Sequence, residues 1–397
     1  MSACCCTIGS LFEVHAGPHE RENALVSVPC AEGACGGSHV VEQLGPDGEV
    51  IASLPGQCAA PAEGEAGHLT VIVPALAAGA VARLRVRDAA EFDPAQGVTI
   101  VPEETHYHFF VRGRHLTSYV VDPRVTRPFC YPLLGPGEVP LTRPVPAPSD
   151  APDWYKAPSE HPHHKGLYVA QGDVNGFDNW SEEPGHARTV NRACQVRAQG
   201  PVYAELLAEN DWVSPAGDPF LAETTLLRVY NLPGETRLLD WDLTWRAAYG
   251  GVFFGDTKEA GTLSVRMAES LRVDHGGRMV NAYGGVGEGE CWGQPAPWVD
   301  YSGLSEGRHV GLAILDHPSN FRYPTTWHVR DYGLFTANCW GRHDFTGDWS
   351  VRGDYALPAG QALHWTFRVV LHEGDEQEGQ IARRWLDFAY PPRVGGG

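Results

Sequence analysis

Glycine and proline divide the chain into short β-type runs, and this punctuation constrains the fold more than any other feature. The 397 residues include 46 Gly and 31 Pro, scattered without a collagen-like period. Runs rich in Val, Ile, Leu and Thr between such residues are typical of strands joined by turns. A convincing helical period occurs in residues 376–389, where Ile381, Trp385 and Leu386 share a face. The sequence therefore predicts an all-β protein with a short C-terminal helix.

The length of the runs changes along the chain. Those of the first part are short, which is typical of a small β-sandwich, and lie at residues 24–28, 49–53, 69–73 and 81–86. Longer runs begin near residue 98, continue to residue 372 and suit a pair of large sheets. We therefore predict a small β-sandwich domain at 1–95 and a second domain at 96–397 that carries the functional site. We find no repeat of 20 to 50 residues, which argues against a propeller or a solenoid.

The charge excludes several classes of partner. Thirty Lys and Arg stand against 49 Asp and Glu, and the net charge of −19 would repel nucleic acid and anionic membranes. No apolar stretch has the roughly 20 residues of a membrane-spanning helix, and the first ten residues lack a signal-peptide pattern. We expect a cytoplasmic protein with reduced cysteines. Cys30 and Cys35 could hold a metal with residues 4–6, but ordinary thiols are expected.

Residues 124–156 form a proline-rich stretch. Proline disfavours both a long helix and a central strand, so we expect an extended loop. Phe129, Tyr131, Leu133 and Leu141 alternate with the prolines. We predict that the loop is ordered and covers one side of a cleft.

The densest group of titratable residues is the HPHHK segment, with His161, His163, His164 and Lys165. In an extended run His161 and His163 point one way and His164 the other, so the three rings cannot meet without a turn. We expect His164 to face a wet cleft, where its replacement would abolish turnover and leave stability nearly intact. The alternative is a polar loop whose histidines cap backbone groups. The segment is followed closely by further polar residues, Asp173, Asn175 and Asp178, and by Trp180.

Lysine is scarce, because the chain has 27 Arg and only three Lys, at 156, 165 and 258. A lysine kept under such a bias suggests a position where a compact or titratable amine is needed. Lys258 stands between Asp256 and Glu259, just after an apolar run. This pattern predicts an acid, an amine and a second acid on one rim, with a salt-bridged turn as the alternative.

A third group mixes aromatic and hydrogen-bonding side chains. This mixture is typical of sugar sites, where rings stack on pyranose faces and polar groups bind hydroxyls. Its members include His317, Asn320, Trp327, His328 and Trp340. Buried tryptophan is more often part of a core, so we expect about two of the aromatic candidates in a cleft.

Other motifs indicate little. The GLSEG sequence at 303–307 has the letters of a nucleophile elbow but precedes a strand, so we interpret it as a turn. Neither a P-loop nor an HExxH motif occurs, and the glycine-rich residues 282–293 do not join a strand to a helix. We expect no nucleotide cofactor.

Three long motifs carry a resemblance to a known family: RPFCYPLLGPGEVPLTRP, HPHHKGLYVAQGDVNGFDNW and ILDHPSNFRYPTTWHVRDYGLFTANCWG. Over about residues 100–390 the chain resembles the soluble bacterial "methane oxygenase PmoA-like" family. The resemblance implies a large antiparallel double-sheet supersandwich like that of galactose mutarotase. It also implies a role in sugar catabolism.

We predict a carbohydrate-active enzyme that performs acid/base chemistry on a sugar or keto-sugar, by epimerisation, β-elimination or glycoside cleavage. An imidazole can exchange a proton near neutral pH, and a carboxylate fixes its tautomer. His163 or His164 is the candidate acid/base, with Glu259 or Asp256 as partner, and Lys165 or Arg143 could stabilise an oxyanion. The candidate substrate-binding residues are Arg127, Tyr131, Arg143, Asp173, Asn175, Asp178, Trp180, Lys258, His317, Asn320, Trp327, His328 and Trp340.

Two alternatives remain open. The same residues could bind a sugar without catalysis, as in a binding or scaffold protein. Alternatively, His161 and His163 could hold a divalent metal with a carboxylate, since Zn, Mn and Fe accept these ligands. We otherwise expect no cofactor, and a small carbohydrate as the partner.

Overall fold

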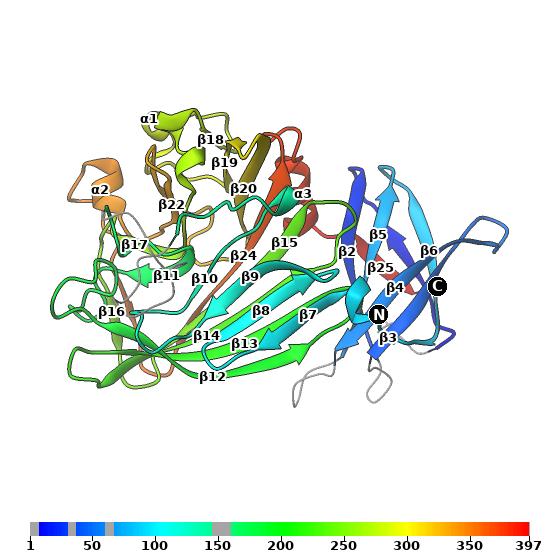
Figure 1. Ribbon diagram of the computed structural model, residues 1–397, viewed down its shortest axis with the longest axis horizontal. Coiled ribbons are helices and arrows are strands. Elements are labelled where there is room, and N and C mark those ends of the chain that lie inside the picture. Colours follow the sequence, from blue (N-terminus) through cyan, green and yellow to red (C-terminus); the bar gives the residue numbers. More distant parts are fainter. Residues whose placement is uncertain (1–7, 31–36, 60–66, 145–159, 397) are drawn as a thin grey trace.

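The computed structural model describes residues 8–30, 37–59, 67–144 and 160–396. Within them, strands form one seven-stranded, two eight-stranded and one two-stranded sheet, all antiparallel (Figure 1). The all-β prediction is confirmed. The described helices are short: α1 Glu288–Cys291, α2 Arg342–Thr346 and α3 Ile381–Ala389, with 3-10 turns η1 Pro94–Gln96, η2 Pro136–Glu138, η4 Glu269–Leu271 and η5 Val273–His275. None of these helices is long and apolar enough to cross a bilayer.

The N-terminal sheet has the order β2-β5-β4-β3-β6-β1-β25 and encloses its own core. Its edge strands β2 and β25 contact each other, so the sheet curls over that core. Its last strand comes from the C-terminus of the chain and pairs with β1. The strands are β1 Leu11–His15, β2 Arg21–Pro29, β3 Gly37–Leu44, β4 Val50–Ala59, β5 His68–Leu76, β6 Val81–Ala90 and β25 Arg393–Gly396.

The first large sheet has the order β21-β22-β17-β11-β10-β9-β8-β7. Its strands are β7 Val98–Pro102, β8 His106–Val111, β9 Arg114–Val120, β10 Phe129–Cys130, β11 Leu167–Gln171, β17 Ala260–Arg266, β21 Trp327–Arg330 and β22 Leu334–Ala337. This sheet carries the candidate site on one of its faces.

The second large sheet has the order β12-β13-β14-β15-β24-β20-β19-β18. Its strands are β12 Arg188–Ala198, β13 Tyr203–Val213, β14 Pro219–Tyr230, β15 Arg237–Arg246, β18 Arg278–Asn281, β19 Trp298–Ser305, β20 Arg308–Asp316 and β24 Ala362–Glu373. The two-stranded sheet joins β16 Val252–Phe254 to β23 Tyr355–Leu357. Figure 1 shows β7 to β9 lying over β12 to β14, and one large hydrophobic core contains residues of both large sheets.

Residue alternation explains how the large sheets bury one face. In β14 the side chains of Leu221 and Leu227 are buried, while the residues on either side of each are partly exposed. In the first large sheet, Leu263 and Phe335 enter the core between the sheets. Residues next to them in sequence therefore point to the opposite side, which we call the outer face.

The proline-rich stretch differs in part from the expectation. Phe129 and Cys130 form a two-residue strand in the middle of the first large sheet, between β9 and β11. A central strand was not expected here, and it is short because Pro128 and Pro132, which lack a backbone N–H, flank it. The part of the loop at 145–159 lies outside the described residues.

The predicted C-terminal helix is present but begins later than the periodicity indicates. Gln380 has a φ of 56°, a left-handed conformation that cannot continue a helix, so α3 starts at Ile381. The helix links the two parts of the chain, because Asp387 accepts a 2.8 Å hydrogen bond from the buried Arg21 of β2.

Candidate functional site

The HPHH segment lies directly before β11 and forms a turn. His161 has a φ of 48°, and the backbone N–H of His164 donates to the carbonyl of His161 at 3.1 Å. The expectation for an extended run therefore does not hold. The turn stacks the ring of His161 on that of His164, with centroids 4.9 Å apart, and brings His163 to 4.3 Å from His164.

His164 is buried, contrary to the expectation of a wet cleft. Its side chain is 2% exposed, and its Nδ1 lies 3.2 Å from Nη1 of Arg266. Burial and the nearby cations hold the pKa of His164 well below its ordinary value. A neutral, enclosed ring that accepts a hydrogen bond from an arginine is a structural group and a poor proton donor at neutral pH.

His163 is more accessible and keeps a chemical role open. Burial and the charge of Arg127 lower its pKa to about 4, although the carboxylates of Glu182 and Glu259 oppose the shift. At neutral pH His163 is therefore an uncharged imidazole that can accept a proton.

Buried cations hold the HPHH segment through its backbone oxygens. Arg127 donates from Nη1 to the carbonyl of His163 at 3.1 Å, and Arg143 from Nη2 to the carbonyl of His161 at 2.9 Å. Lys165 donates from Nζ to the carbonyl of Pro162 at 3.1 Å. These three predicted site residues therefore use their side-chain N–H groups to hold the backbone of the turn in place.

Glu182 balances part of this charge. Its carboxylate accepts hydrogen bonds from Arg127 at 3.0 Å and from Lys165 at 3.2 Å. Burial alone would raise the pKa of Glu182, but the two cations hold it below its ordinary value. The resulting network fixes the loop around residue 182 against the HPHH turn.

A row of polar side chains crosses the outer face beside this turn. Tyr168, Ser264, Thr336 and His328 occupy paired positions on β11, β17, β22 and β21. All four are buried, and within the described residues the three hydroxyls have no hydrogen-bond partner.

Trp180 connects this row to the HPHH turn. Its ring centroid lies 6.2 Å from that of His163, 5.9 Å from Tyr168 and 6.3 Å from His328. The ring is 1% exposed, so it packs these groups together and presents no open face.

Glu259 directly precedes β17 and interacts electrostatically with His163 and His328. Burial opposes its ionisation, but Lys258, His328 and His163 outweigh burial and hold the pKa of Glu259 below its ordinary value. Lys258 donates to its carboxylate, which is 42% exposed. An ionised, accessible carboxylate therefore lies within electrostatic range of two imidazoles.

Asp256 lies elsewhere and does not contact the HPHH turn. Its Oδ1 is 2.8 Å from Nδ1 of His343, and its Oδ2 accepts from the backbone N–H of Gly353 at 2.5 Å. The ring of His343 stacks on Trp349, with centroids 4.1 Å apart. His343 closely follows the TANCWG end of the third motif, but its separation from Asp256 in sequence gave no sign that the two would pair.

Three polar residues predicted to bind substrate stabilise turns instead. Asp173 accepts from the backbone N–H of Gly176 at 3.1 Å, and Asn175 from that of Phe253 at 2.8 Å. Asp178 accepts from the backbone N–H of Trp180 at 2.6 Å. These contacts are those of Asx turns and loop anchors.

The third sequence group is mostly structural. Trp327 and Trp340 are fully buried in the core between the sheets, so they cannot serve as sugar platforms. Asn320 binds the backbone of Thr366, and the ring of His317 packs on Phe388 of α3. Tyr131 is half-buried and packs with the outer-face cluster that contains Trp180, and His328 stacks on the ring of Trp180.

The described residues contain no group of three His, Cys, Asp or Glu side chains that could hold a metal ion. His161 hydrogen-bonds Glu160 at 2.8 Å. The sulfur of Cys30 lies 3.2 Å from that of Cys58, and Cys35 and residues 4–6 fall outside the described residues.

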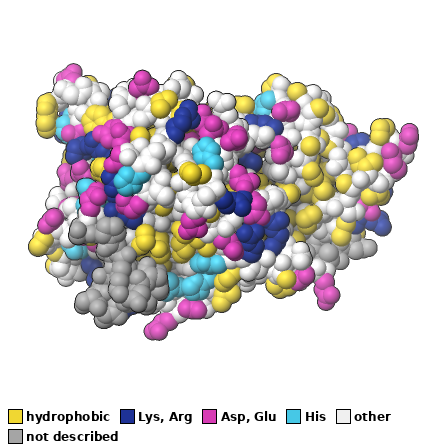
Figure 2. All heavy atoms as spheres, turned by 45° about the horizontal axis from the view of Figure 1, so that its top comes forward, with side chains coloured by type: hydrophobic (Ala, Val, Ile, Leu, Met, Phe, Trp, Pro, Cys, Tyr) yellow, Lys and Arg dark blue, Asp and Glu magenta, His cyan; other side chains and the backbone are white. Residues whose placement is uncertain are grey.

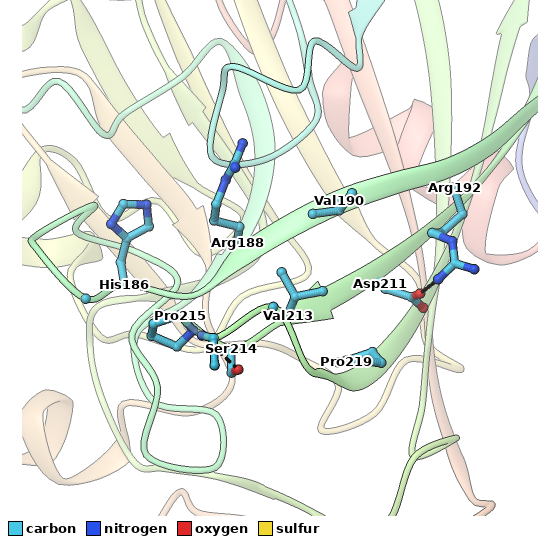
Figure 3. A pocket seen from close by; sticks show the side chains of 12 residues that line it. His186, Arg188, Val190, Arg192, Asp211, Val213, Ser214, Pro215 and Pro219 are labelled. Atoms are coloured by element: carbon cyan, nitrogen blue, oxygen red, sulfur yellow. Dashed lines mark hydrogen bonds and ion pairs between the residues drawn. The ribbon is translucent and has the colours of Figure 1, made fainter.

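A pocket of about 760 Å³ lies on the second large sheet, at the ends of β12 and β13 (Figure 3). Its polar side chains are already engaged: Arg192 pairs with Asp211, and Arg188 donates to the carbonyl of Val125 at 2.9 Å. None of the predicted site residues lines it. Acidic side chains are spread over the face shown in Figure 2 with basic ones among them, in keeping with the net charge of −19.

Comparison with solved structures finds distant similarity. A glycosyl hydrolase family 38 protein from Enterococcus faecalis is 9% identical with a TM-score of 0.42, over 98% of this chain and 47% of that one. An alpha-mannosidase from Enterococcus faecalis V583 is 12% identical with a TM-score of 0.42, over 98% and 46%. A galactose mutarotase related enzyme from Lactobacillus acidophilus is 10% identical with a TM-score of 0.26, over 70% and 97%.

The chain spans less than half the length of the first two of these proteins. At such TM-scores the similarities assign no activity. A search of the curated proteins found no match. A family model matches residues 107–386 and is described as a family of unknown function, and not by the PmoA-like description. Because the match covers more than half of the sequence, the chain belongs to this family of unknown function (DUF6807).

Proposed function

We propose that the chain is a carbohydrate-active enzyme that transfers a proton on a sugar or keto-sugar, with Glu259 and His163 as its acid/base pair. The observation that carries the proposal is their place in one neighbourhood beside the outer face of the first large sheet: the ring of Trp180 packs on both His163 and His328, at 6.2 and 6.3 Å, and the charge of Glu259 acts on both imidazoles. General acid/base catalysis requires such groups at a site that a substrate can reach.

The two groups differ in a way that suits proton transfer. Glu259 is ionised and partly exposed, so it is the base that removes a proton from a substrate carbon. His163 is neutral and half-buried, and it receives or relays that proton. Lys258 keeps the carboxylate charged until substrate binds.

The reaction type follows from the fate of the deprotonated carbon. Return of the proton to the other face gives epimerisation, and loss of a neighbouring oxygen substituent gives β-elimination. Glycoside cleavage would instead use one group to protonate the leaving oxygen. The PmoA-like resemblance adds the context of sugar catabolism, and the cytoplasmic location stays a prediction.

A non-catalytic sugar-binding protein is the second candidate, and the same experiment separates it. The protein is incubated in D₂O with a panel of ketoses, keto-glycosides, uronates and methyl glycosides, and proton NMR follows C–H exchange and product formation. We expect turnover of at least one sugar. The variants Glu259→Gln and His163→Asn should lose about 10²- to 10⁴-fold in rate.

The matched controls are Glu209→Gln and His309→Asn, whose side chains are exposed on the second large sheet. They should keep the rate of the unchanged protein. Saturable binding of a sugar without any turnover would favour the binding protein. Full activity of Glu259→Gln would refute the assignment of the base.

A further inference from the structure

A cavity of about 590 Å³ lies where α3 meets the edge of the second large sheet, beside the N-terminal sheet (Figure 1). Val280 of the edge strand β18 and Trp298 of β19 line it from the large sheet. Gln377 and Gln380 line it from the turn before α3, and Glu20 from the connection between β1 and β2. Cavities that hold small ligands have volumes of roughly 300–1,000 Å³ and occur preferentially where separate parts of a protein meet. This cavity therefore has the size and the position of a ligand site.

Two ion pairs border the cavity and balance its charge. Arg278 donates to Glu376, and Arg383 donates to Glu20 at 3.2 Å. These four side chains are the charged members of the lining, so two cations stand against two anions. Arg383 also donates to Glu22. A phosphate or a carboxylate therefore gains no net attraction here, and an amine gains little because the carboxylates are already paired.

Several side-chain N–H groups of the lining are available to a ligand. The amide oxygen of Asn281 accepts from two backbone N–H groups at 3.0 Å, and the amide oxygen of Gln380 accepts from Arg383. Within the described residues, no hydrogen bond is made by the amide nitrogens of Asn281, Gln377 and Gln380 or by the indole nitrogen of Trp298. All four remain open to solvent or a ligand, since none is a buried unpaired atom of the described part of the chain. The lining therefore offers four uncharged donors, which suit hydroxyl oxygens.

Trp298 adds an aromatic surface to these donors. Its ring is 6% exposed and packs with Val280 in one apolar cluster. Tyr283, which is 72% exposed, stands in the chain between Ala282 and Gly284, and both of these line the cavity. Aromatic rings beside uncharged polar groups are typical of sugar sites, because the rings stack on pyranose faces while the polar groups bind hydroxyls.

The backbone of Gln380 is strained in a way that local structure does not require. Its φ of 56° and ψ of 38° lie in the left-handed region, where glycine has no steric cost. The side chain at this position holds Arg383 through its amide oxygen and lines the cavity. Strain of this kind is typical of positions where a side chain serves a ligand site.

We propose that this cavity is a binding site for a neutral sugar. The ring of Trp298 contacts the apolar face of the sugar, and the amide and indole N–H groups donate to its hydroxyl oxygens. The balanced ion pairs accept from and donate to further hydroxyls without selecting a charged ligand. The site is separate from Glu259 and His163, which lie beside the first large sheet, so the inference does not depend on the proposed acid/base chemistry.

The first test follows the Trp298 ring directly. Protein that contains fluorotryptophan is studied by fluorine NMR, and the Trp298 signal is assigned by its loss in Trp298→Phe. Glucose, galactose, mannose, maltose and cellobiose are titrated in turn. We expect at least one of them to shift the Trp298 signal saturably and to leave the signal of Trp365, which is buried in the core between the large sheets, unchanged. No saturable shift with any of these sugars, or equal shifts of both signals, would overturn the proposal.

The second test checks that the ligand is uncharged. The uronate and the amino derivative of the sugar that binds best are titrated under the same conditions at pH 7. We expect both to bind more weakly than the neutral sugar. Tighter binding of either charged derivative would overturn the assignment of the ligand class.

The third test uses calorimetric titration and needs no assignment of the Trp298 signal. Gln377→Ala removes an exposed amide, and Gln380→Gly removes an amide while its backbone suits the left-handed conformation. We expect each variant to bind the best sugar about 3- to 10-fold more weakly, as for the loss of one hydrogen bond. The matched control is Gln361→Ala, an exposed glutamine before β24, which should keep the Kd of the unchanged protein. Unchanged affinity in both cavity variants would contradict the proposal.

A last comparison separates this site from the acid/base pair. The Trp298 signal should respond to the sugar equally in the unchanged protein and in the double variant Glu259→Gln, His163→Asn. Loss of the response in the double variant would locate the sugar beside the first large sheet and overturn the inference. Because the response does not require turnover, an inactive protein that still shows it would refute the proposed enzyme and leave this site standing.

Discussion

Replacing Arg127 with Gln should destabilise the protein strongly, because this buried guanidinium joins the HPHH turn to the loop around residue 182. Arg127 donates to the carbonyl of His163 at 3.1 Å, to Glu182 at 3.0 Å and to the carbonyl of Trp180 at 3.1 Å. Removing one member of a buried ion pair costs roughly 3–5 kcal/mol. Lys165 remains bonded to Glu182 at 3.2 Å and limits the loss, so we expect about 3 kcal/mol.

The assay is thermal unfolding at pH 7, followed by calorimetry and near-ultraviolet circular dichroism. For a domain of this size about 3 kcal/mol corresponds to a fall in Tm of roughly 6–12 °C. The control is Arg352→Gln, whose ion pair with Asp354 is exposed to solvent, so its Tm should stay close to that of the unchanged protein. A fall in Tm for Arg127→Gln no larger than that of the control would refute the structural role of Arg127.

Three further predictions use the same thermal assay. His164→Ala should lower stability by about 1–3 kcal/mol, because it leaves the buried Arg266 donor unpaired. An unchanged Tm would contradict the structural role of His164 and favour a ring that faces an open cleft. Trp340→Ala should cost about 3–5 kcal/mol as a core cavity, and a loss below about 1 kcal/mol would show that the ring is not packed as described. Burial opposes a charge on His372, but Asp300, 2.6 Å away, raises the pKa of His372 above its ordinary value. This stabilisation is complete below the unfolded pKa of about 6.5 and is lost as pH rises through the higher folded pKa, so the Tm difference between the unchanged protein and His372→Gln should shrink as pH rises above about 6.5. A difference that grows with pH would contradict the pairing.

The strands were predictable where residue type and period agree. The run at 222–230 is β14, and the helical period at 376–389 contains α3. Strand β3, whose sequence is GSHVVEQL, shows no clear alternation of apolar and polar residues. It forms a strand because it pairs with β4 on one side and with β6 on the other. The pairing of β25 with β1 joins the two ends of the chain, which no local pattern reveals.

The candidate site was predictable in its members more than in their arrangement. His163, Glu259, Trp180 and His328 were all singled out, and the structure brings them into one neighbourhood. His161 adopts a left-handed conformation that residue propensity does not indicate. The resulting turn buries the ring of His164 next to Arg266.

A residue that organises the site was missed for a physical reason. Arg266 ends the apolar strand β17. A charged residue in such a strand indicates an outward-facing position. Its partner, however, is decided by the neighbouring strands and by loops distant in sequence.

The measurement that tests the central claim most directly is a double-mutant cycle on the rate of C–H exchange in D₂O. The unchanged protein, Glu259→Gln, His163→Asn and the double variant are compared on the most active sugar of the panel. If the two groups act as a unit, each single variant loses about 10²-fold or more and the double variant loses little beyond the worse single one. Single variants that keep the full rate, or losses that simply multiply in the double variant, would contradict an acid/base pair of Glu259 and His163.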